Sequence, residues 1–268
     1  MSQTRIVSAK LLGGLGNQLF IVAAAYGYAR RHGISYGIYM NTIEHSPHSA
    51  QPYEWTIFKN ILKFHSIPPT FTYTENGCRC ICYDTIPQYD TQHLHLIGYF
   101  QSEKYLEGCA AEFLDLLEFP QCDVDDPDWY SNACFIHIRR GDYLKWHLHN
   151  VDLWTRYYPS AIARMQELHR GVNFLICSDD IPWCEAQPFF RDAAATGRLR
   201  FLREKDEVKS MLIMSQCRIG GICANSSFSW WSAFKNKNPQ KTVIFPAKWF
   251  NNDWPNQVAF QGSLVMEV

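Results

Sequence analysis

The residues best equipped for chemistry follow a short apolar stretch in the middle of the chain. Residues 134–138 are apolar and β-branched enough to form a buried strand, and the sequence then runs Arg139-Arg140-Gly141-Asp142. A strand that ends in this way carries a charged cluster out of the end of a sheet, where ligands bind in open α/β proteins. Arginine is also the side chain that grips a diphosphate through paired hydrogen bonds. The competing interpretation is a plain surface salt bridge between Arg140 and Asp142.

A second predicted strand, 172–177, also ends in polar residues. It runs into Ser178-Asp179-Asp180, and a helix must begin close to Pro182 because proline is tolerated only in the first turn. One of the two aspartates is expected to cap that helix. The other would be free to accept N–H groups from a base such as guanine.

A third predicted strand, 217–222, leads to the run 225–228, Asn-Ser-Ser-Phe, at the start of a helix. Hydroxyls and backbone amides at a helix start favour phosphate, although a plain N-cap by Ser226 or Ser227 would also account for them. Because the carboxyl ends of parallel strands share one edge of a sheet, we expect the three groups to converge on one crevice. Together they supply the positive charge, the base reader and the amides that a nucleoside diphosphate needs.

Alternating strands and helices are expected to position these groups in a parallel sheet with right-handed crossovers. In the second half we predict strands at 133–138, 172–177, 199–202, 217–222 and 242–245, and helices at 154–169, 182–190 and 206–215. In the first half we predict strands at 5–12, 34–40 and 93–99, and helices ending at 32 and spanning 54–64 and 103–117. The acidic, proline-bearing run 120–128 is the best candidate for a linker.

A glycine-rich turn, residues 13–18, joins the first strand to the first helix. This layout lets backbone N–H groups approach an anion or a sugar closely, although taken alone it indicates a tight turn without a ligand. Its spacing is not the G-x-G-x-x-G fingerprint. The sequence therefore argues against a dinucleotide-dependent oxidoreductase.

Composition narrows the function classes further. The 268-residue chain has a formal net charge of −1, so no global field favours nucleic acid or a membrane surface. No signal sequence is evident, and no apolar stretch approaches the ~18 residues of a membrane span. We expect a cytoplasmic protein without stable membrane insertion, and its ten cysteines as reduced thiols. The group Cys78, Cys80 and Cys82 lacks the usual zinc spacing, so no metal site is predicted.

Five motifs, in order from about residue 8 to about residue 250, resemble those of the α1,2-fucosyltransferase family. They are Gly13-Gly14-Leu15-Gly16-Asn17-Gln18-Leu19-Phe20, Gly98-Tyr99-Phe100-Gln101-Ser102-Glu103-Lys104-Tyr105, His137-x-Arg139-Arg140-Gly141-Asp142-Tyr143, Ser178-Asp179-Asp180 and Asn225-Ser226-Ser227-Phe228-Ser229-Trp230-Trp231. The resemblance implies an α/β, GT-B-like fold with two Rossmann-like domains facing across a cleft. Residues 1–122 would be the acceptor-side domain and residues 123–268 the GDP-fucose-binding domain, whose last segment packs back on the first.

The resemblance also implies a galactoside α1,2-fucosyltransferase. Such an enzyme moves L-fucose from GDP-β-L-fucose to the 2-hydroxyl of a galactose-terminated oligosaccharide or glycan, with inversion and without a cofactor or metal. By the same match, Arg139 would hold the donor diphosphate, His137 would lie near the ribose and Asp179 would read guanine. The other donor-binding residues would be Asn17, from the opposing domain, and Ser178, Asn225, Ser226, Ser227 and Phe228.

The predicted catalytic set is Arg139, Asp142 and His149. Arg139 and the helix-start amides would stabilise charge on the departing phosphate. Asp142 stands at the right strand end, but a salt bridge to Arg140 would lower its pKa and weaken it as a base. A histidine just downstream, His147 or His149, has a better-matched pKa. Deprotonation by solvent or by the leaving phosphate stays open.

Two other classes compete with this interpretation. A non-catalytic glycan- or nucleotide-binding module, with tryptophan and tyrosine stacking on sugars, would explain the aromatic content but not three polar strand ends. A thiol-redox or zinc protein would account for the cysteines.

Overall fold

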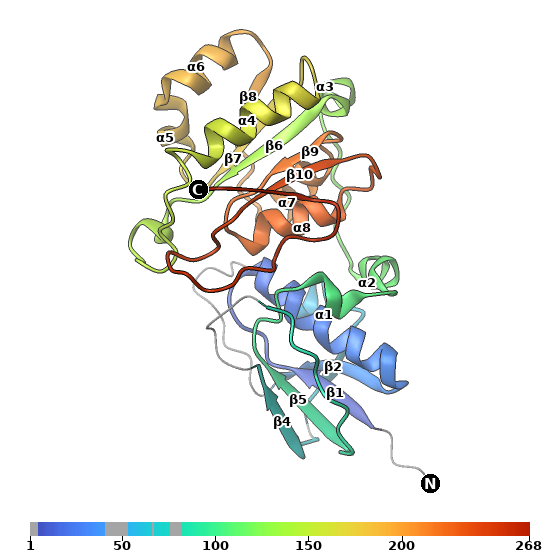
Figure 1. Ribbon diagram of the computed structural model, residues 1–268. Helices are drawn as coiled ribbons and strands as arrows, with labels where there is room; N and C mark the ends of the chain where they lie inside the picture. The colour runs from blue at the N-terminus through green and yellow to red at the C-terminus, as the bar shows by residue number, and fades with distance from the viewer. Residues whose placement is uncertain (1–4, 41–52, 66, 76–81) are drawn as a thin grey trace. The chain divides into compact units, whose positions relative to one another are not determined.

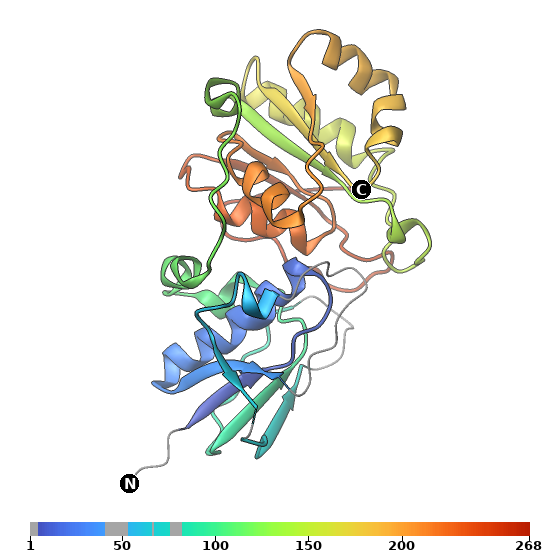
Figure 2. The ribbon, with the colours of Figure 1, turned by 180° about the vertical axis from the view of Figure 1, so that it is seen from behind.

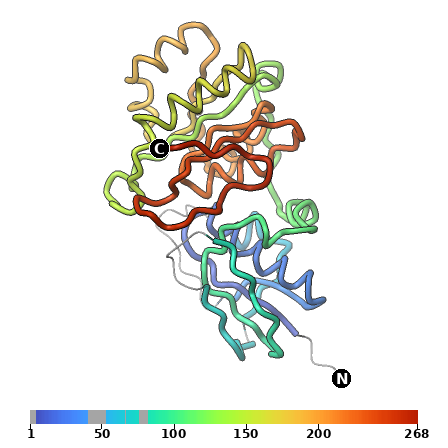
Figure 3. The backbone as a smooth tube through the Cα atoms, viewed as in Figure 1, coloured from blue at the N-terminus to red at the C-terminus, as the bar shows by residue number. Residues whose placement is uncertain are grey.

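The computed structural model describes residues 5–40, 53–65, 67–75 and 82–268. The chain divides into two compact α/β units, Met1–Phe119 and Pro120–Val268. In Figure 3 the first unit runs from blue to green and the second from green to red. Each unit is built on a parallel sheet, which is the two-domain, Rossmann-like arrangement of a GT-B-like fold. The sequence predicts the boundary after residue 122, and the structure divides the chain after Phe119.

The first unit holds a five-stranded sheet in the order β3-β2-β1-β5-β4. Its strands are β1 (Ile6–Ala9), β2 (Ser35–Tyr39), β3 (Leu62–Phe64), β4 (Phe71–Thr74) and β5 (His93–Ile97). Its helices are α1 (Leu15–His32) and α2 (Ala110–Leu116), with 3₁₀ turns η2 (Tyr53–Trp55) and η3 (Glu103–Leu106).

The long helix α1 is almost entirely buried and ends at Gly33, whose left-handed φ of 62° terminates the helix. Gly27 in its middle lets the chain pass closely, because a Cβ there would lie 1.7 Å from the carbonyl oxygen of Tyr105. Small residues on α1 therefore allow η3 to pack directly against it.

Two helices predicted in the first unit are wrong or incomplete. Residues 54–64 do not form a helix: η2 and a turn are followed by strand β3, because β2 offers a parallel edge to residues 62–64. The predicted helix 103–117 is split into η3 and α2. Gly108 lies between them with φ +74°, which breaks the helical path.

The second unit holds a six-stranded sheet in the order β11-β10-β9-β6-β7-β8. Its strands are β6 (Ala133–Ile138), β7 (Asn173–Ser178), β8 (Leu199–Phe201), β9 (Gly220–Ile222), β10 (Thr242–Pro246) and β11 (Leu264–Met266). Its helices are α3 (Pro127–Ser131), α4 (Tyr157–Leu168), α5 (Ile181–Ala186), α6 (Pro188–Ala195), α7 (Glu207–Ser215) and α8 (Ser227–Lys235), with the 3₁₀ turn η4 (Asp142–Leu144). Helix α4 covers one face of the sheet, and α7 and α8 cover the other (Figures 1 and 2).

This sheet follows the nucleotide-binding Rossmann order, reading β8-β7-β6-β9-β10-β11. The predicted helix 182–190 is divided by Pro188, which opens α6. The last segment of the chain lies in this unit, where β11 pairs in parallel with β10. The strand order reverses between β6 and β9, so the crevice expected of such a sheet lies beyond the carboxyl ends of these two strands.

Candidate active site

Strand β6 delivers the arginines to this edge of the sheet. All six of its residues are buried, and it lies between β7 and β9. Two tyrosines of α4 fix the strand ends from one face. The Tyr158 hydroxyl donates to the carbonyl of His137 (2.7 Å), and the Tyr157 hydroxyl donates to that of Cys223 (2.7 Å). The first residue outside the buried strand is Arg139.

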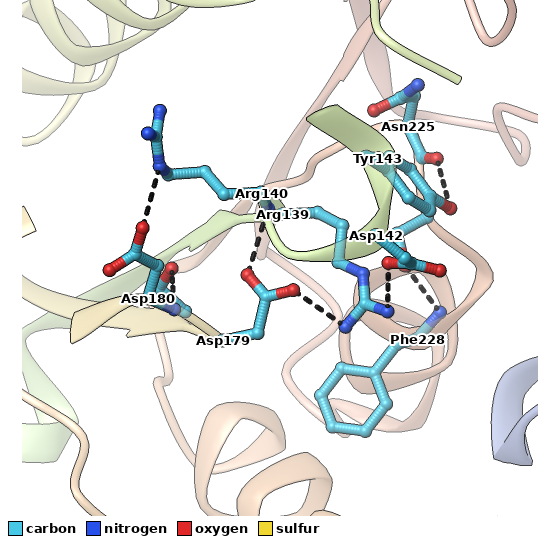
Figure 4. Close-up of polar contacts among 10 residues, drawn as sticks. Arg139, Arg140, Asp142, Tyr143, Asp179, Asp180, Asn225 and Phe228 are labelled. Atoms are coloured by element: carbon cyan, nitrogen blue, oxygen red, sulfur yellow. Dashed lines mark hydrogen bonds and ion pairs between the residues drawn. The ribbon is translucent and has the colours of Figure 1, made fainter. Parts of the chain in front are cut away.

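Arg139 lies between two carboxylates (Figure 4). Its Nη2 is 2.6 Å from Oδ1 of Asp142, and its Nη1 is 3.0 Å from Oδ2 of Asp179. The three side chains are 28%, 28% and 23% exposed. The guanidinium is therefore oriented before any ligand arrives, yet it still reaches solvent.

Arg140 points away from Arg139 (Figure 4). Its Nε lies 3.1 Å from Oδ2 of Asp180, and its guanidinium carbon is 3.7 Å from the ring centre of Trp183. The expected pair of Arg140 with Asp142 is therefore wrong. Successive residues beyond a strand point in opposite directions, so Asp142 pairs with Arg139 and Arg140 reaches the next strand end.

Gly141 permits the approach of the second strand end to the first. A Cβ at this position would lie 2.4 Å from Oδ2 of Asp179. No larger residue fits unless that carboxylate moves, and with it the contact to Arg139. Gly141 therefore allows the loops that follow β6 and β7 to pack closely against each other.

Both aspartates of the second strand end are engaged. Asp180 caps α5 by accepting from the backbone N–H of Trp183 (3.2 Å), as expected for one of the pair. Asp179 is not free, which corrects the sequence expectation: its Oδ1 accepts from the backbone N–H of Arg140 (2.9 Å), and its Oδ2 meets Arg139. Ser178 is also used locally, since its hydroxyl accepts from the backbone N–H of Asp180 (3.0 Å). The sequence pattern could not reveal the two contacts of Asp179, because they depend on the loop that follows the neighbouring strand β6.

The third strand end is held by Asn225, which is 3% exposed. Its Nδ2 donates to the carbonyls of His149 (3.1 Å) and Trp249 (2.9 Å). Its backbone carbonyl accepts from the hydroxyl of Tyr143 (3.3 Å). Asn225 therefore connects the loops that follow β6, β9 and β10. Its side-chain amide nitrogen donates to carbonyls within the protein.

Helix α8 begins directly after this asparagine. Ser226 is its N-cap and accepts from the backbone N–H of Phe228 (3.4 Å), which is the plain capping role foreseen for one of the serines. Ser227 is the first helical residue and is partly exposed. The ring of Phe228 lies 5.6 Å from that of His137, so the helix start and the end of β6 are in contact.

His137 is 5% exposed, and its Nδ1 has no hydrogen-bond partner in the described chain. Burial, aided by the neighbouring guanidinium of Arg139, lowers the pKa of His137 to about 3. The imidazole is therefore neutral near pH 7. The Nδ1 of His137 is thus a buried polar atom that the described chain leaves unsatisfied, at the end of the strand that carries Arg139.

Tyr143 has no individual role predicted from the sequence, yet it lies between Arg139 and the predicted catalytic residue His149. The ring of Tyr143 lies 5.3 Å from the guanidinium carbon of Arg139 and 4.9 Å from the ring of His149. Burial raises the pKa of Tyr143 to about 12. Burial lowers the pKa of His149 below its ordinary value, although the carboxylate of Asp142 opposes this shift. Only the adjacency of Tyr143 to the arginine motif could have identified it.

The structure thus brings together most of the predicted residues at one edge of the second sheet. Asn17 is the exception because it belongs to the first unit, where its Oδ1 accepts from Nε2 of Gln101 (2.8 Å). His147, the other candidate histidine, is exposed.

The described residues contain free thiols and no cluster of metal-ligating side chains. Among residues 5–40, 53–65, 67–75 and 82–268, no group of three His, Cys, Asp or Glu side chains is arranged to hold a metal ion. Cys78 and Cys80 lie outside the described residues. The cysteines inside them are free thiols. Within the same ranges no helix is long and apolar enough to cross a membrane.

The chain is similar to known glycosyltransferases in sequence and in fold. The chain is 27% identical to an α-1,2-colitosyltransferase of Escherichia coli over 92% of this chain and 93% of that protein. It is 32% identical to the O-antigen biosynthesis glycosyltransferase WbnK of Escherichia coli over 45% of this chain and 40% of that protein. The fold resembles that of the α-1,6-fucosyltransferase NodZ, with a TM-score of 0.54, 14% identity, and coverage of 85% of this chain and 91% of the NodZ chain.

The family described as glycosyl transferase family 11 matches residues 86–261, a stretch that contains all three polar strand ends. The resemblance drawn from the motifs is thereby confirmed: the chain belongs to glycosyl transferase family 11 and is a glycosyltransferase.

Proposed function

We propose that this enzyme transfers L-fucose from GDP-β-L-fucose to the 2-hydroxyl of a terminal galactoside, forming an α1,2 linkage with inversion. The observation that carries the proposal is that the ends of β6, β7 and β9 meet at the switch point of the second sheet, where Asp142 and Asp179 hold Arg139. Family membership supplies the reaction class, and the α-1,2-colitosyltransferase supports the linkage. NodZ, whose structure was determined with GDP-fucose, supports the donor.

Arg139 can serve a diphosphate without giving up its present partners. A guanidinium has five N–H donors, and the two carboxylates engage one nitrogen each. The remaining donors are available to phosphate oxygens. Asp142 and Asp179 would hold the guanidinium in place, which lowers the cost of ordering it when the donor binds.

The start of α8 would supply the second half of the diphosphate site. Ser226, Ser227 and Phe228 present the first-turn amides of a nine-residue helix, where an anion is favoured. Charge that grows on the departing β-phosphate would then be met by these amides and by Arg139, without a metal. In this proposal, turnover survives treatment with EDTA.

Asp179 is assigned to guanine, although it also touches Arg139. A carboxylate accepts about four hydrogen bonds, and Arg139 and the backbone N–H of Arg140 use one on each oxygen, so two acceptor positions remain for the base edge. Inosine diphosphate lacks the guanine amino group. The wild type should bind GDP more tightly than inosine diphosphate, and Asp179→Asn should abolish that preference.

For the base we favour His149 over Asp142. Burial lowers the pKa of His149, so it is neutral and able to accept a proton at pH 7. Asp142 is held by Arg139 at 2.6 Å, so its carboxylate is already engaged by the guanidinium. His149→Gln should lower kcat and flatten the acidic limb of the pH profile, and an unchanged profile would remove His149 from this role.

The α-1,2-colitosyltransferase makes colitosyl transfer the second candidate. The direct test is incubation with GDP-fucose and a panel of galactosides, in parallel with a nucleotide-activated colitose donor, followed by NMR analysis of the product linkage. Release of GDP from GDP-fucose with formation of an α1,2 bond supports the proposal. Turnover of the colitose donor alone, or a different linkage, would contradict it.

A further inference from the structure

An aromatic series leads outward from the arginine of the candidate site. Tyr143 lies against Arg139, and the ring of His149 lies 4.9 Å from that of Tyr143. The ring of Trp146 follows, 6.1 Å from that of His149. The three aromatic residues belong to one loop after β6, so the series connects the proposed diphosphate site with the protein surface.

Trp146 is 61% exposed, the largest exposed fraction of any bulky apolar side chain in the described part of the chain. Tryptophan is highly buried on average in folded proteins. An indole left in solvent forfeits the free energy that burial would contribute, about 25 cal/mol for each Å² of apolar surface. This cost is recovered when a ligand covers the ring.

The loop that carries this indole is anchored rather than a free tip. The carbonyl of Trp146 accepts from the backbone N–H groups of His149 (2.8 Å) and Asn150 (3.0 Å). The carbonyl of Leu148 accepts from the backbone N–H of Asn251 (2.7 Å), and that of His149 accepts from the buried Asn225. The ring is therefore presented in a defined place.

We propose that Trp146 and His149 form the subsite for the acceptor sugar, with the apolar face of the galactose ring lying on the indole and its hydroxyl edge turned toward the imidazole. This inference rests on the proposed function and names the part of the protein that would bind the acceptor. A pyranose has an apolar C–H face and a polar rim, which matches an aromatic ring beside a polar group. The ring nitrogens of His149 make no hydrogen bond to another residue in the described chain, so they are available to a hydroxyl.

A lipid surface is the competing occupant, because Leu144 on the same loop is 49% exposed and Lys145 stands between the two apolar side chains. The sugar is favoured by the ring contact of Trp146 with His149 and by the continuity of both with Arg139. An interfacial anchor would require neither contact.

The test compares Trp146→Ala and Trp146→Phe with two controls in steady-state kinetics on a galactoside and GDP-fucose. Trp146→Ala should raise the acceptor KM about tenfold, as the loss of roughly 1.4 kcal/mol of stacking implies. Trp146→Phe should restore part of the affinity, and the donor KM should not move. The controls are Leu144→Ala, 49% exposed on the same loop, and Phe189→Ala, 51% exposed on α6. Neither control should change the acceptor KM.

An acceptor KM in Trp146→Ala equal to that of the wild type would overturn the subsite. So would an effect that Leu144→Ala shares and that appears only when the acceptor is embedded in anionic phospholipid vesicles, which would identify a membrane contact. Saturation-transfer NMR with the galactoside and GDP separates this inference from the proposed function. Saturation transfer that the wild type shows and Trp146→Ala lacks supports the subsite even if no fucose is moved.

Discussion

The two sheets of this protein place their polar residues differently. In the first sheet, Ser8, His93 and His95 lie within strands β1 and β5 and are 0%, 0% and 3% exposed. In the second unit, the ion-paired residues of the candidate site lie just beyond the ends of β6 and β7, where the Arg139 and Asp179 side chains are 28% and 23% exposed. The same type of fold therefore contains one polar cluster inside its sheet and another at its edge.

The cluster inside the first sheet serves the fold. The hydroxyl of Ser8 lies 2.7 Å from Nε2 of His93 and 2.9 Å from Nδ1 of His95. Burial lowers the pKa of both imidazoles, that of His95 to about 4. Neutral rings in one hydrogen-bonded group avoid the penalty of an ionised buried side chain.

The cluster at the edge of the second sheet contributes little to stability. Its ion pairs are partly solvated, and such pairs contribute roughly 0–1 kcal/mol to stability. They can therefore be rearranged around a ligand at little cost to the fold. The hydrogen-bonded cluster within β1 and β5 therefore bears on stability, whereas the ion-paired cluster beyond β6 and β7 is the one proposed to bind a ligand.

The largest effect is expected at Arg139. Arg139→Ala should lower the rate of sugar transfer about 10²–10³-fold, as removal of a preorganised charge-stabilising donor does. Its melting temperature should change little, because only partly exposed ion pairs are lost. Steady-state kinetics tests the expected loss of transfer rate, and thermal unfolding of the same preparation tests the expected melting temperature. A variant that loses stability but keeps its transfer rate would break the comparison.

The next effect is an acid-dependent loss of stability in the first unit. The folded-state pKa of His95 is lowered, so its contribution is present above the unfolded pKa of 6.5 and is lost as the pH falls toward about 4. The expected slope is about 1.4 kcal/mol for each pH unit and for each proton taken up on unfolding. Hydrogen exchange of β1 and β5 should follow this slope.

The variant His95→Gln isolates that contribution. It cannot take up the proton, so the pH dependence of exchange in β1 and β5 should flatten, whatever the variant does to stability at pH 7. Exchange of β6 in the second unit has its own pH dependence through His137, and as the internal control it should keep the same slope in the wild type and the variant. Equal slopes in the wild type and the variant would show that His95 does not couple the first sheet to pH.

Asn225 shares a feature with each cluster. It is buried, like the cluster in the first sheet, and it lies at the candidate site of the second unit. Asn225→Asp places a carboxylate against the carbonyls of His149 and Trp249, and should destabilise the protein by about 1–3 kcal/mol. It should also raise the KM values, because three loops lose their common partner. Asn236→Asp is the matched control.

Asn236 is 5% exposed, and its Nδ2 donates to the carbonyl of Cys217 (2.7 Å). Cys217 precedes β9 and Asn225 follows it, so this contact lies at the opposite end of that strand. Its aspartate variant should lose similar stability in denaturant unfolding but keep its KM values after correction for the folded fraction. Similar kinetic defects in the two variants would reduce the role of Asn225 to stability alone.

The smallest effect is expected at Asp142. Asp142→Asn removes a negative charge 2.6 Å from Arg139 while leaving an oxygen that can accept from it. GDP affinity should rise about fivefold, which corresponds to roughly 1 kcal/mol. Asp126→Asn is the control, because Asp126 pairs with Arg200 (2.7 Å) at the start of α3. Weaker GDP binding by Asp142→Asn would mean that its charge mainly orients the arginine.

Local signals in the sequence predicted much of the second unit. The range 133–138 was predicted without error, because a β-branched apolar run bounded by charges has few alternatives. Asp206 was expected to open its helix and caps α7. The convergence of the strand ends followed from the alternation of strands and helices. The predicted helix 182–190 is wrong across Pro188, which opens a second helix, and α3 and β11 are not predicted.

The sequence does not predict which charged side chains pair with each other, or which short segments form strands at the edge of a sheet. Whether Arg139 or Arg140 faces Asp142 depends on the direction of each side chain beyond β6, which composition does not encode. Strand β4 forms because β5 offers it an edge, although its own residues are mostly exposed. Trp146 became notable only through its exposure and its contact with His149. Each miss depends on contacts between residues distant in the sequence or on the course of a loop.

Calorimetric titration of GDP into the wild type and Arg139→Ala tests the central claim most directly. We expect a measurable affinity for GDP in the wild type and an affinity at least about tenfold lower in Arg139→Ala, because a charge-assisted contact contributes roughly 1.5–3 kcal/mol. Equal affinities would contradict it, because the edge where the three strand ends meet would then not be the diphosphate site.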